Sequence, residues 1–450
     1  MKKKLLSVLL CGVLAVGSLA ACGGASDGSG SGDAGTSDGG ETAAVQSEDE
    51  NTLTVQAWDA NFNIPALQAA EAAYQKKNPD FKLEILEVSG DGDIKQEITL
   101  AGESGDYSNL PDIVLFQDHA IQNFVRNYPD AWSDALNSAD INWSDFGEEK
   151  LSYSTIEGKH YGAPVDNGTC IFAYRVDLLE QAGYTLDDVT GITWDKFDEI
   201  GKKVYETTGK YLLCMDGSGN DLPYEMLQAE GASQWKDGKP YITDNQTMIE
   251  ICKVIVKLAQ DNVLYLANDW SDYTDQVIQG DMVAGVMNGN WIIPTIEAVD
   301  ANSGKWEITT MPTLSGAEGY AANGGSSLYI TSNCKKADLA ADFLAYTFGG
   351  GEGSSETYDN SLLNGGVIGT CISASKSDVY NQGVEFFNGQ AIYPTIVEYG
   401  SHVATVEQND FHYDLRELVG NAIQQAIEGG NIEELLAQAE QDITFKMESQ

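Results

Sequence analysis

Residues 53–85 read LTVQAWDANFNIPALQAAEAAYQKKNPDFKLEI, and their pattern indicates the fold class. Apolar and polar residues alternate over Leu53–Ala57, which predicts a strand. Asn63-Ile-Pro65 opens a helix with its apolar residues at helical spacing, and Asn78-Pro79 ends it. Phe81–Ile85 alternates again as a second strand. A strand, a helix and a strand in this order are typical of an α/β fold.

The same alternation continues along the chain. The further strands that we expect are Ile113–Phe116, Thr169–Tyr174, Val283–Met287 and Leu328–Ile330. The further helices that we expect are Asp93 to about Ala101, one from near Asp177, Trp194 to about Tyr205 with Thr193 as its cap, Ala337–Phe348, Leu415 to about Glu428, and one from Ile432 onwards. Strands that alternate with helices in this way predict a largely parallel sheet.

The composition excludes several classes of protein. The 450 residues include 69 acidic and 25 basic ones, a net charge of −44, which argues against binding along a nucleic-acid backbone. A hydrophobic content of 42% with 9% aromatic residues is too high for a disordered chain. The length predicts two domains. The apolar stretch at the N-terminus is too short for a permanent membrane-spanning helix.

The N-terminus has the features of an export signal. Lys2–Lys4 are positively charged, Leu5–Val16 is apolar, and Leu19-Ala-Ala21 precedes Cys22. This resembles the lipobox of bacterial lipoproteins, so we expect a signal peptide over residues 1–21 and a lipid, including palmitate, on the Cys22 thiol. A plain secretory signal with a chance cysteine is the alternative. Residues 22–50 are rich in Gly, Ser and Asp and predict a flexible acidic tether.

Enzyme and metal motifs have no supporting context. The G-x-S-x-G at residues 24–28 and the G-x-G-x-x-G at residues 30–35 lie in the tether, away from any expected strand or helix. The four histidines are widely separated. We therefore expect no catalytic residue, no metal site and no cofactor. Five cysteines beyond Cys22 are far apart and are expected to be small buried residues: Cys170, Cys214, Cys252, Cys334 and Cys371.

Short clusters of polar and aromatic residues stand beside the expected strands. They are Trp58-Asp-Ala-Asn61, Gln117-Asp-His119, Asp166-Asn167 and Asn288-Gly-Asn-Trp291. Ligands of open α/β sheets bind beyond the carboxyl ends of strands, so these clusters are expected to share one crevice. Asp and Asn can hydrogen-bond to vicinal hydroxyls, and an indole offers a flat apolar face to a sugar ring. The clusters contain no Lys or Arg, which favours an uncharged ligand.

These residues also have structural interpretations. A tryptophan at a strand end, such as Trp58, can belong to the core. Asn290 can cap a helix, and Asp118 and Asp166 can cap helices or turns. Trp270 lies in a polar loop, where it can be a binding platform or packing for a lid.

Eight segments carry a resemblance to a known family. They are YQKKNP at 74–79, LPDIV at 110–114, GKHYGAP at 158–164, YRVDLLEQAG at 174–183, TWDKF at 193–197, GDMVAGVMNGNW at 280–291, GGSSLYI at 324–330 and AADFL at 340–344. In these segments and their order, the chain resembles the carbohydrate-type extracellular solute-binding proteins of ABC importers, the superfamily that contains maltose-binding protein.

The resemblance implies an α/β, two-lobed periplasmic-binding-protein-like (type II) fold with a hinge between the lobes. By position, the N-lobe would hold residues 51–165 and 311–348, and the C-lobe residues 166–310 and 349–450. The resemblance also implies the binding residues Trp58, Asp59, Gln117, Asp118, Asp166, Tyr224, Asn290, Trp291 and Gly325. The clusters and the polar loop add Asn61, Asn167 and Trp270. The chain departs from the best-known members at Asp216–Asp221, before Tyr224, and in the glycine-rich segment Gly349–Ser355.

The expected function is capture of a neutral sugar, an oligosaccharide, between the lobes and its delivery to the membrane subunits of an ABC permease. We expect a monomer outside the cytoplasm, held at the cell membrane by the lipid on Cys22. Two alternatives stay open. A lipid-anchored glycoside hydrolase would need two carboxylates about 5–10 Å apart. A binding protein for a peptide, a phosphate ester or a metal would need cations or grouped His and Cys.

Overall fold

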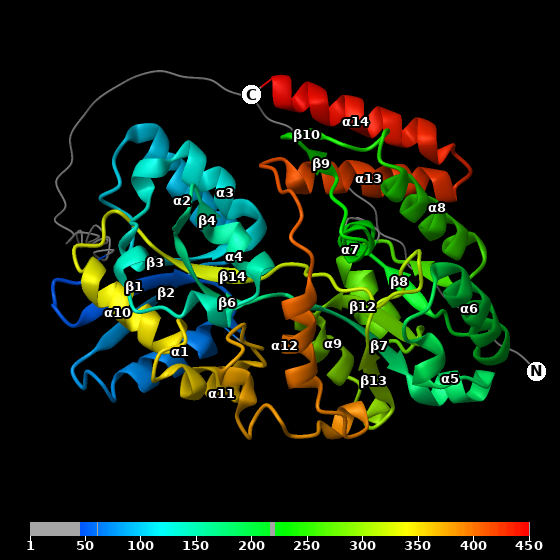
Figure 1. Ribbon diagram of the computed structural model, residues 1–450, viewed down its shortest axis with the longest axis horizontal. Coiled ribbons are helices and arrows are strands. Elements are labelled where there is room, and N and C mark those ends of the chain that lie inside the picture. Colours follow the sequence, from blue (N-terminus) through cyan, green and yellow to red (C-terminus); the bar gives the residue numbers. More distant parts are fainter. Residues whose placement is uncertain (1–45, 61, 217–220, 450) are drawn as a thin grey trace, which may run out of the picture. The chain divides into compact units, whose positions relative to one another are not determined.

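The structure is a computed structural model that describes residues 46–60, 62–216 and 221–449. Figure 1 shows its helices and strands, coloured along the chain. The predicted signal peptide, Cys22 and residues 22–45 of the predicted tether lie outside the described residues. No helix within the described ranges is long and apolar enough to cross a membrane.

A five-stranded sheet forms the first group of strands. Its strands are β1 (Thr52–Ala57), β2 (Lys82–Glu87), β3 (Ile113–Gln117), β6 (Gly162–Asp166) and β14 (Ser326–Ile330). Their order is β2-β1-β3-β14-β6. Strand β1 is parallel to β2 and β3, whereas β14 is antiparallel to both β3 and β6. Strand β14 therefore completes a sheet whose first strand, β1, comes before the whole second group of strands in the sequence.

Helices pack against this sheet and connect its strands. They are α1 (Asn63–Tyr74), α2 (Asp91–Ser104), α3 (Asp118–Asn127), α4 (Glu148–Ser154), α10 (Ala337–Thr347) and α11 (Ser354–Gly365). In β3, Ile113–Phe116 are all buried, because helices cover both faces of the sheet. A small antiparallel pair, β4 (Thr155–Ile156) and β5 (Lys159–His160), leads into β6.

A second, three-stranded sheet has the order β12-β7-β13. Its strands are β7 (Cys170–Arg175), β12 (Gly285–Gly289) and β13 (Trp306–Thr309). The surrounding helices are α5 (Val176–Ala182), α6 (Trp194–Thr208), α7 (Asp221–Ala229), α8 (Gln246–Gln260), α9 (Ile293–Glu297), α13 (His412–Ile427) and α14 (Ile432–Glu448). Two further pairs are the parallel β8 (Leu213–Met215) with β11 (Leu264–Leu266) and the antiparallel β9 (Trp235–Lys236) with β10 (Lys239–Pro240).

The chain passes between the two sheets several times. The first passage joins β6 to β7, and the second joins β13 to β14. Single β-bridges link the passages to one another, from Thr169 to Ala322 and from Asp166 to Gly369. Helix α12 (Ile392–His402) contacts β7 of the second sheet. These passages lie next to the residues that form the candidate site described below.

The structure confirms the α/β class and most of the expected elements, but it corrects the predicted strand direction. The first sheet is partly parallel, whereas β12 and β13 are both antiparallel to β7. An apolar strand pattern does not show whether a strand runs parallel or antiparallel to its neighbour. That direction depends on the path by which the chain comes back to the sheet. Two details are confirmed: the Thr193 hydroxyl caps α6 by accepting from the amide of Lys196 at 3.2 Å, and the five cysteines are buried.

The late strand β14 gives a test of the first sheet. We expect Leu328→Ala to lower the free energy of unfolding by about 2–5 kcal/mol, because Leu328 is fully buried between β3 and β6. Leu363→Ala is the control, since this leucine is 66% exposed and its loss should change stability by about 0.5 kcal/mol at most. Urea unfolding of both variants measures the difference. Equal midpoints would contradict the place of Leu328 in the core.

Candidate functional site

A cleft of about 570 Å³ contains about half of the predicted binding residues. Its volume lies within the roughly 300–1,000 Å³ that is usual for small-molecule sites. Of the predicted residues, the lining includes Trp58, Asp59, Gln117, Asp166, Trp291 and Gly325. The lining also includes Phe62, Asn63, Asp221, Pro294, Asn323, Gly324, Ser326, Gly365 and Tyr413. Among these described lining residues there is no lysine and no arginine.

The aromatic lining comes from elements of both sheets. Trp58 directly follows β1, and Phe62 directly precedes α1. Trp291 lies in a short 3₁₀ helix (Asn290–Ile292) that follows β12, and Tyr413 lies in the first turn of α13. The Trp291 indole is oriented by its Nε1, which donates to the carbonyl oxygen of Asn323 at 2.8 Å. The cleft therefore has flat apolar faces on elements that follow strands of different sheets.

The acidic residues of the lining differ in their surroundings. Asp59 is exposed and has a positive φ of 65°, and its carboxylate accepts from the amide of Phe62 at 3.1 Å. Asp166 is buried at the end of β6, where its carboxylate accepts from the amide of Ser326 at 2.9 Å. Burial raises the pKa of Asp166 to about 6, although the charge of Lys150 opposes the shift. Near neutral pH, Asp166 can therefore act as an acceptor or, when protonated, as a donor.

Asp118 lies beneath the cleft rather than in its lining. It is fully buried, forms an ion pair with Lys150, and accepts from the hydroxyl of Ser327 at 3.0 Å. Gly325 separates it from the cleft with a φ of 92°, and a Cβ at this position would lie 2.5 Å from the Asp118 carboxylate. Glycine at 325 is thus required both by the backbone conformation and by the buried carboxylate below it.

Asn167 and Asn290 line a second, much smaller cavity, together with Lys150 and Thr169. This cavity has a volume of about 20 Å³, which is enough for a water molecule and far too small for a sugar. Asn167 Nδ2 donates to the Thr169 hydroxyl at 3.3 Å, and the backbone amide of Asn290 donates to the Thr169 carbonyl at 2.8 Å. Both asparagines thus support the passage between β6 and β7.

The three remaining predicted residues are not in the described lining. Trp270 is 43% exposed and stands outside the cleft, with its ring centroid 5.6 Å from that of Trp291. Tyr224 is buried in α7, in a cluster of aromatic rings. Asn61 lies outside the described residues. The structure therefore brings together six of the predicted residues and puts Trp270 next to this group. Four more are buried and lie outside the lining: Asp118, Asn167, Tyr224 and Asn290.

Several lining residues were missed by the sequence analysis. Asp221 was named only as the end of the segment Asp216–Asp221 that departs from the family, although the structure places it at the start of α7. Asn323 directly precedes Gly324-Gly325, and a polar residue before a strand is the signal that was used for the other clusters. Tyr413 carried no such signal, because it lies just before the expected amphipathic helix that begins at Leu415 and next to no expected strand. Only the return of α13 toward the first sheet brings it to the cleft.

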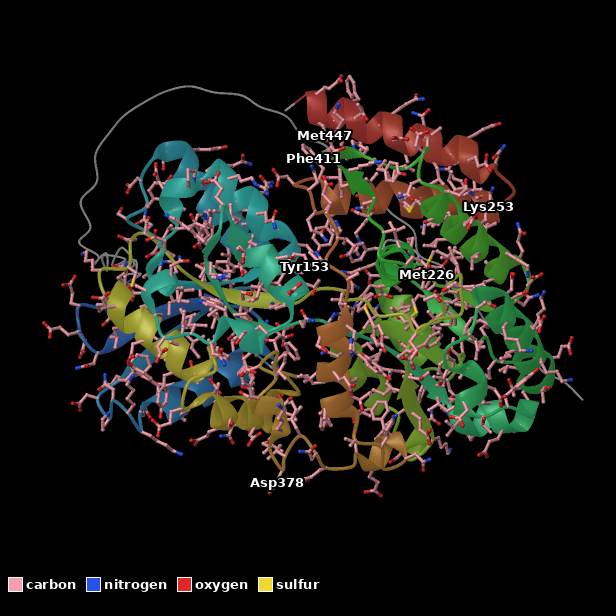
Figure 2. The ribbon with its side chains drawn as sticks, in the orientation of Figure 1. Tyr153, Met226, Lys253, Asp378, Phe411 and Met447 are labelled. Carbon is pink, nitrogen blue, oxygen red and sulfur yellow. The ribbon has the colours of Figure 1, made fainter. Side chains whose placement is uncertain are left out.

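A buried cluster of rings joins α3 and α4 to α7 and α13 next to the cleft. The rings of His119 and His412 stack with centroids 4.9 Å apart and planes 8° apart. Tyr153, labelled in Figure 2, packs edge-on against His119 at 4.7 Å. Burial, with the nearby charges of Arg416 and Lys150, lowers the pKa of His119 to about 3. Both imidazoles are therefore neutral near pH 7.

Comparison with known proteins identifies the family. Residues 69–361 match the model of the family described as bacterial extracellular solute-binding protein. The lactose-binding protein of Rhizobium radiobacter is 30% identical over 400 residues, which cover 88% of this chain and 92% of the relative. The arabinooligosaccharide-binding protein of Bacillus subtilis (strain 168) is 21% identical over 358 residues, 78% of this chain and 81% of the relative. This chain belongs to the bacterial extracellular solute-binding protein family.

A solved structure supports the same fold. The sugar-binding protein MalE of Xanthomonas citri has a TM-score of 0.72 and 15% identity, and the match covers 87% of this chain and 96% of that protein. The fold is thus the two-lobed, type II fold of periplasmic binding proteins that the resemblance implied. The five-stranded sheet is the centre of one lobe, and the three-stranded sheet is the centre of the other.

The buried histidine gives a pH-dependent prediction. Because the pKa of His119 is lowered to about 3 in the folded chain, the unfolded chain alone binds this proton between about pH 6.5 and 3. His119 therefore costs stability as the pH falls through this window. We expect the stability of His119→Leu relative to the wild type to rise by about 1 kcal/mol for each pH unit below 6.5.

Urea unfolding of the ligand-free chain at pH 7, 6 and 5 measures this difference. Other shifted groups, such as Glu149 with a pKa raised to about 7 by burial, titrate in both proteins, so their contributions largely cancel. Parallel stability curves for the two proteins would show that His119 is not held neutral by its surroundings.

Proposed function

We propose that this protein is an extracytoplasmic solute-binding protein that captures a neutral oligosaccharide in the cleft and delivers it to an ABC permease. The observation that carries the proposal is the lining of the cleft. Trp58 and Trp291 supply apolar faces, Asp166, Asp221 and Asn323 supply carboxyl and amide groups, and the described lining includes no cation. Such a lining suits a ring with hydroxyl groups at its edge and C–H groups on its faces.

Binding is proposed to close the lobes by population shift. A ligand that touches residues of both lobes binds the closed state more tightly than the open one, so it moves the equilibrium toward closure. The permease would then recognise the closed state. In this proposal the sugar is released intact, and Asp59 and Asp166 act as hydrogen-bonding groups rather than as catalysts.

The cellular setting of the proposal rests on the N-terminal sequence. A lipid on Cys22 would hold the protein at the membrane, and residues 22–50 would let it reach the permease. The net charge of −44 favours repulsion between copies and from anionic headgroups, which agrees with a monomer on a tether.

A sugar panel tests the proposal. The relatives are named for lactose and arabinooligosaccharides, and a binding protein from B. animalis subsp. lactis Bl-04 has a solved structure in complex with β-1,6-galactobiose. We expect at least one of lactose, β-1,6-galactobiose and arabinotriose to stabilise the chain, by about 2.7 kcal/mol at 100 times its dissociation constant. Digalacturonate is the anionic control and should not bind. No stabilisation by any neutral sugar would contradict the proposal.

The same panel separates binding from hydrolysis. The lining does contain carboxylates, the groups that glycoside hydrolysis requires. Chromatography of each sugar after long incubation with the protein should recover it unchanged. Release of monosaccharides would replace the binding proposal by the hydrolase alternative.

The Trp291 indole is expected to supply one stacking face. Trp291→Ala should weaken the binding of the best panel sugar at least tenfold, about 1.4 kcal/mol, and Trp291→Phe should restore part of the loss. Trp143→Ala is a matched control, because it also removes a half-buried stacked indole, 4.0 Å from the ring of His160, but outside the cleft. Calorimetric titration measures all three. Equal affinities for Trp291→Ala and the wild type would remove Trp291 from the site.

A further inference from the structure

Arg416 is the fifth residue of α13 and lies behind the cleft, with its side chain fully buried. A buried guanidinium is stable only when its charge is compensated and its donors are bonded. Arg416 Nη2 forms an ion pair with Asp221 Oδ1 at 2.5 Å. The same nitrogen donates to Asn323 Oδ1 at 3.2 Å.

The guanidinium also packs against aromatic rings. It lies 4.6 Å from the ring centroid of Tyr224 and 5.2 Å from that of Tyr413. These distances are within the range of cation–π attraction. Its Nη1 lies 3.5 Å from His412 Nε2, in the ring cluster between the lobes.

Three of these partners line the cleft, and they come from three separate parts of the chain. Asp221 begins α7, Asn323 lies in the passage from β13 to β14, and Tyr413 is in the first turn of α13. Arg416 contacts all three of them, through an ion pair, a hydrogen bond and a cation–π contact.

Asn323 extends the influence of Arg416 to the indole. The backbone carbonyl of Asn323 accepts from Trp291 Nε1 at 2.8 Å, and its side-chain Nδ2 donates to Asn288 Oδ1 at 2.9 Å. The hydrogen bond from Arg416 thus fixes the side chain of Asn323, and the backbone carbonyl of Asn323 orients the Trp291 ring. A shift of Asn323 would move an aromatic face and an amide of the cleft together.

We propose that Arg416 is a positioning residue for ligand binding, which holds Asp221, Asn323 and Tyr413 in the arrangement that faces the sugar. Arg416 does not line the cleft and acts only through these partners. The planar fork of arginine suits this task, because it can bond to two acceptors while it stacks on a ring, whereas lysine presents a single point charge. The inference rests on the proposed function, since it concerns the affinity of the same cleft.

The test compares Arg416→Met and Arg416→Lys with a matched control. Arg175→Met is that control: Arg175 is also buried, also pairs with aspartates (Asp177 and Asp281), and also lies over an aromatic ring, but it is in β7, away from the cleft lining. The probe is the tightest-binding sugar of lactose, β-1,6-galactobiose and arabinotriose. Its dissociation constant is measured by calorimetry, well below the melting temperature of each variant, with circular dichroism to show that each is folded.

We expect Arg416→Met to weaken binding at least tenfold, Arg416→Lys to lie between it and the wild type, and Arg175→Met to stay within twofold of the wild type. A double-mutant cycle with Asp221→Asn separates positioning from a general loss of stability. If Arg416 acts through Asp221, the double variant should lose much less affinity than the product of the two single losses.

The outcomes distinguish this inference from the proposed function. Wild-type binding with an unchanged affinity in Arg416→Met overturns the inference alone. Equal losses in Arg416→Met and Arg175→Met also overturn it, because they indicate a general structural effect. Failure of the wild-type chain to bind any of the three sugars overturns the proposed function, and the inference with it.

Discussion

The site depends on one topological constraint: β14 is hydrogen-bonded between β3 and β6, although the whole second sheet separates it from them in sequence. The chain must therefore leave the first sheet after β6 and return to it before β14. The return brings Asn323–Ser326 to the cleft, beside the end of β6 at Asp166. Because β14 cannot pair without this return, the fold of the first lobe and the floor of the cleft form together.

Two ion pairs with buried cations give the cleft its chemical character. Lys150 compensates Asp118 beneath Gly325, and Arg416 compensates Asp221 on the other side. Both cations are almost completely buried, at 1% and 0% side-chain exposure. They can therefore order carboxylates and backbone without offering a positive charge to the ligand. A chain with a large acidic excess thus presents carboxyl, amide and aromatic groups in the cleft.

The sequence predicts the strands and helices well, because periodic burial is a local property of Leu53–Ile85 and its counterparts. It predicts the direction of β12 and β14 wrongly, since direction depends on distant returns of the chain. Aromatic and polar residues next to strands, such as Trp58 and Asp166, are found from the sequence pattern alone. Tyr413 and Arg416 could not be found in this way. The sequence pattern of a helix does not show which of its residues will contact a loop that is distant in the sequence. The burial of Asp118 could not be predicted either, because it depends on the ion pair with Lys150, which is distant in the sequence.

The central claim is that a neutral sugar is held between aromatic faces of the two lobes. A crystal structure of the chain with the tightest-binding panel sugar tests it most directly. The account predicts that a sugar ring lies against Trp58 or Trp291 and that its hydroxyl groups bond to carboxyl or amide groups of both lobes, Asp166 and Asp221 among them. A sugar bound outside this cleft, or in contact with one lobe only after closure, would contradict the account.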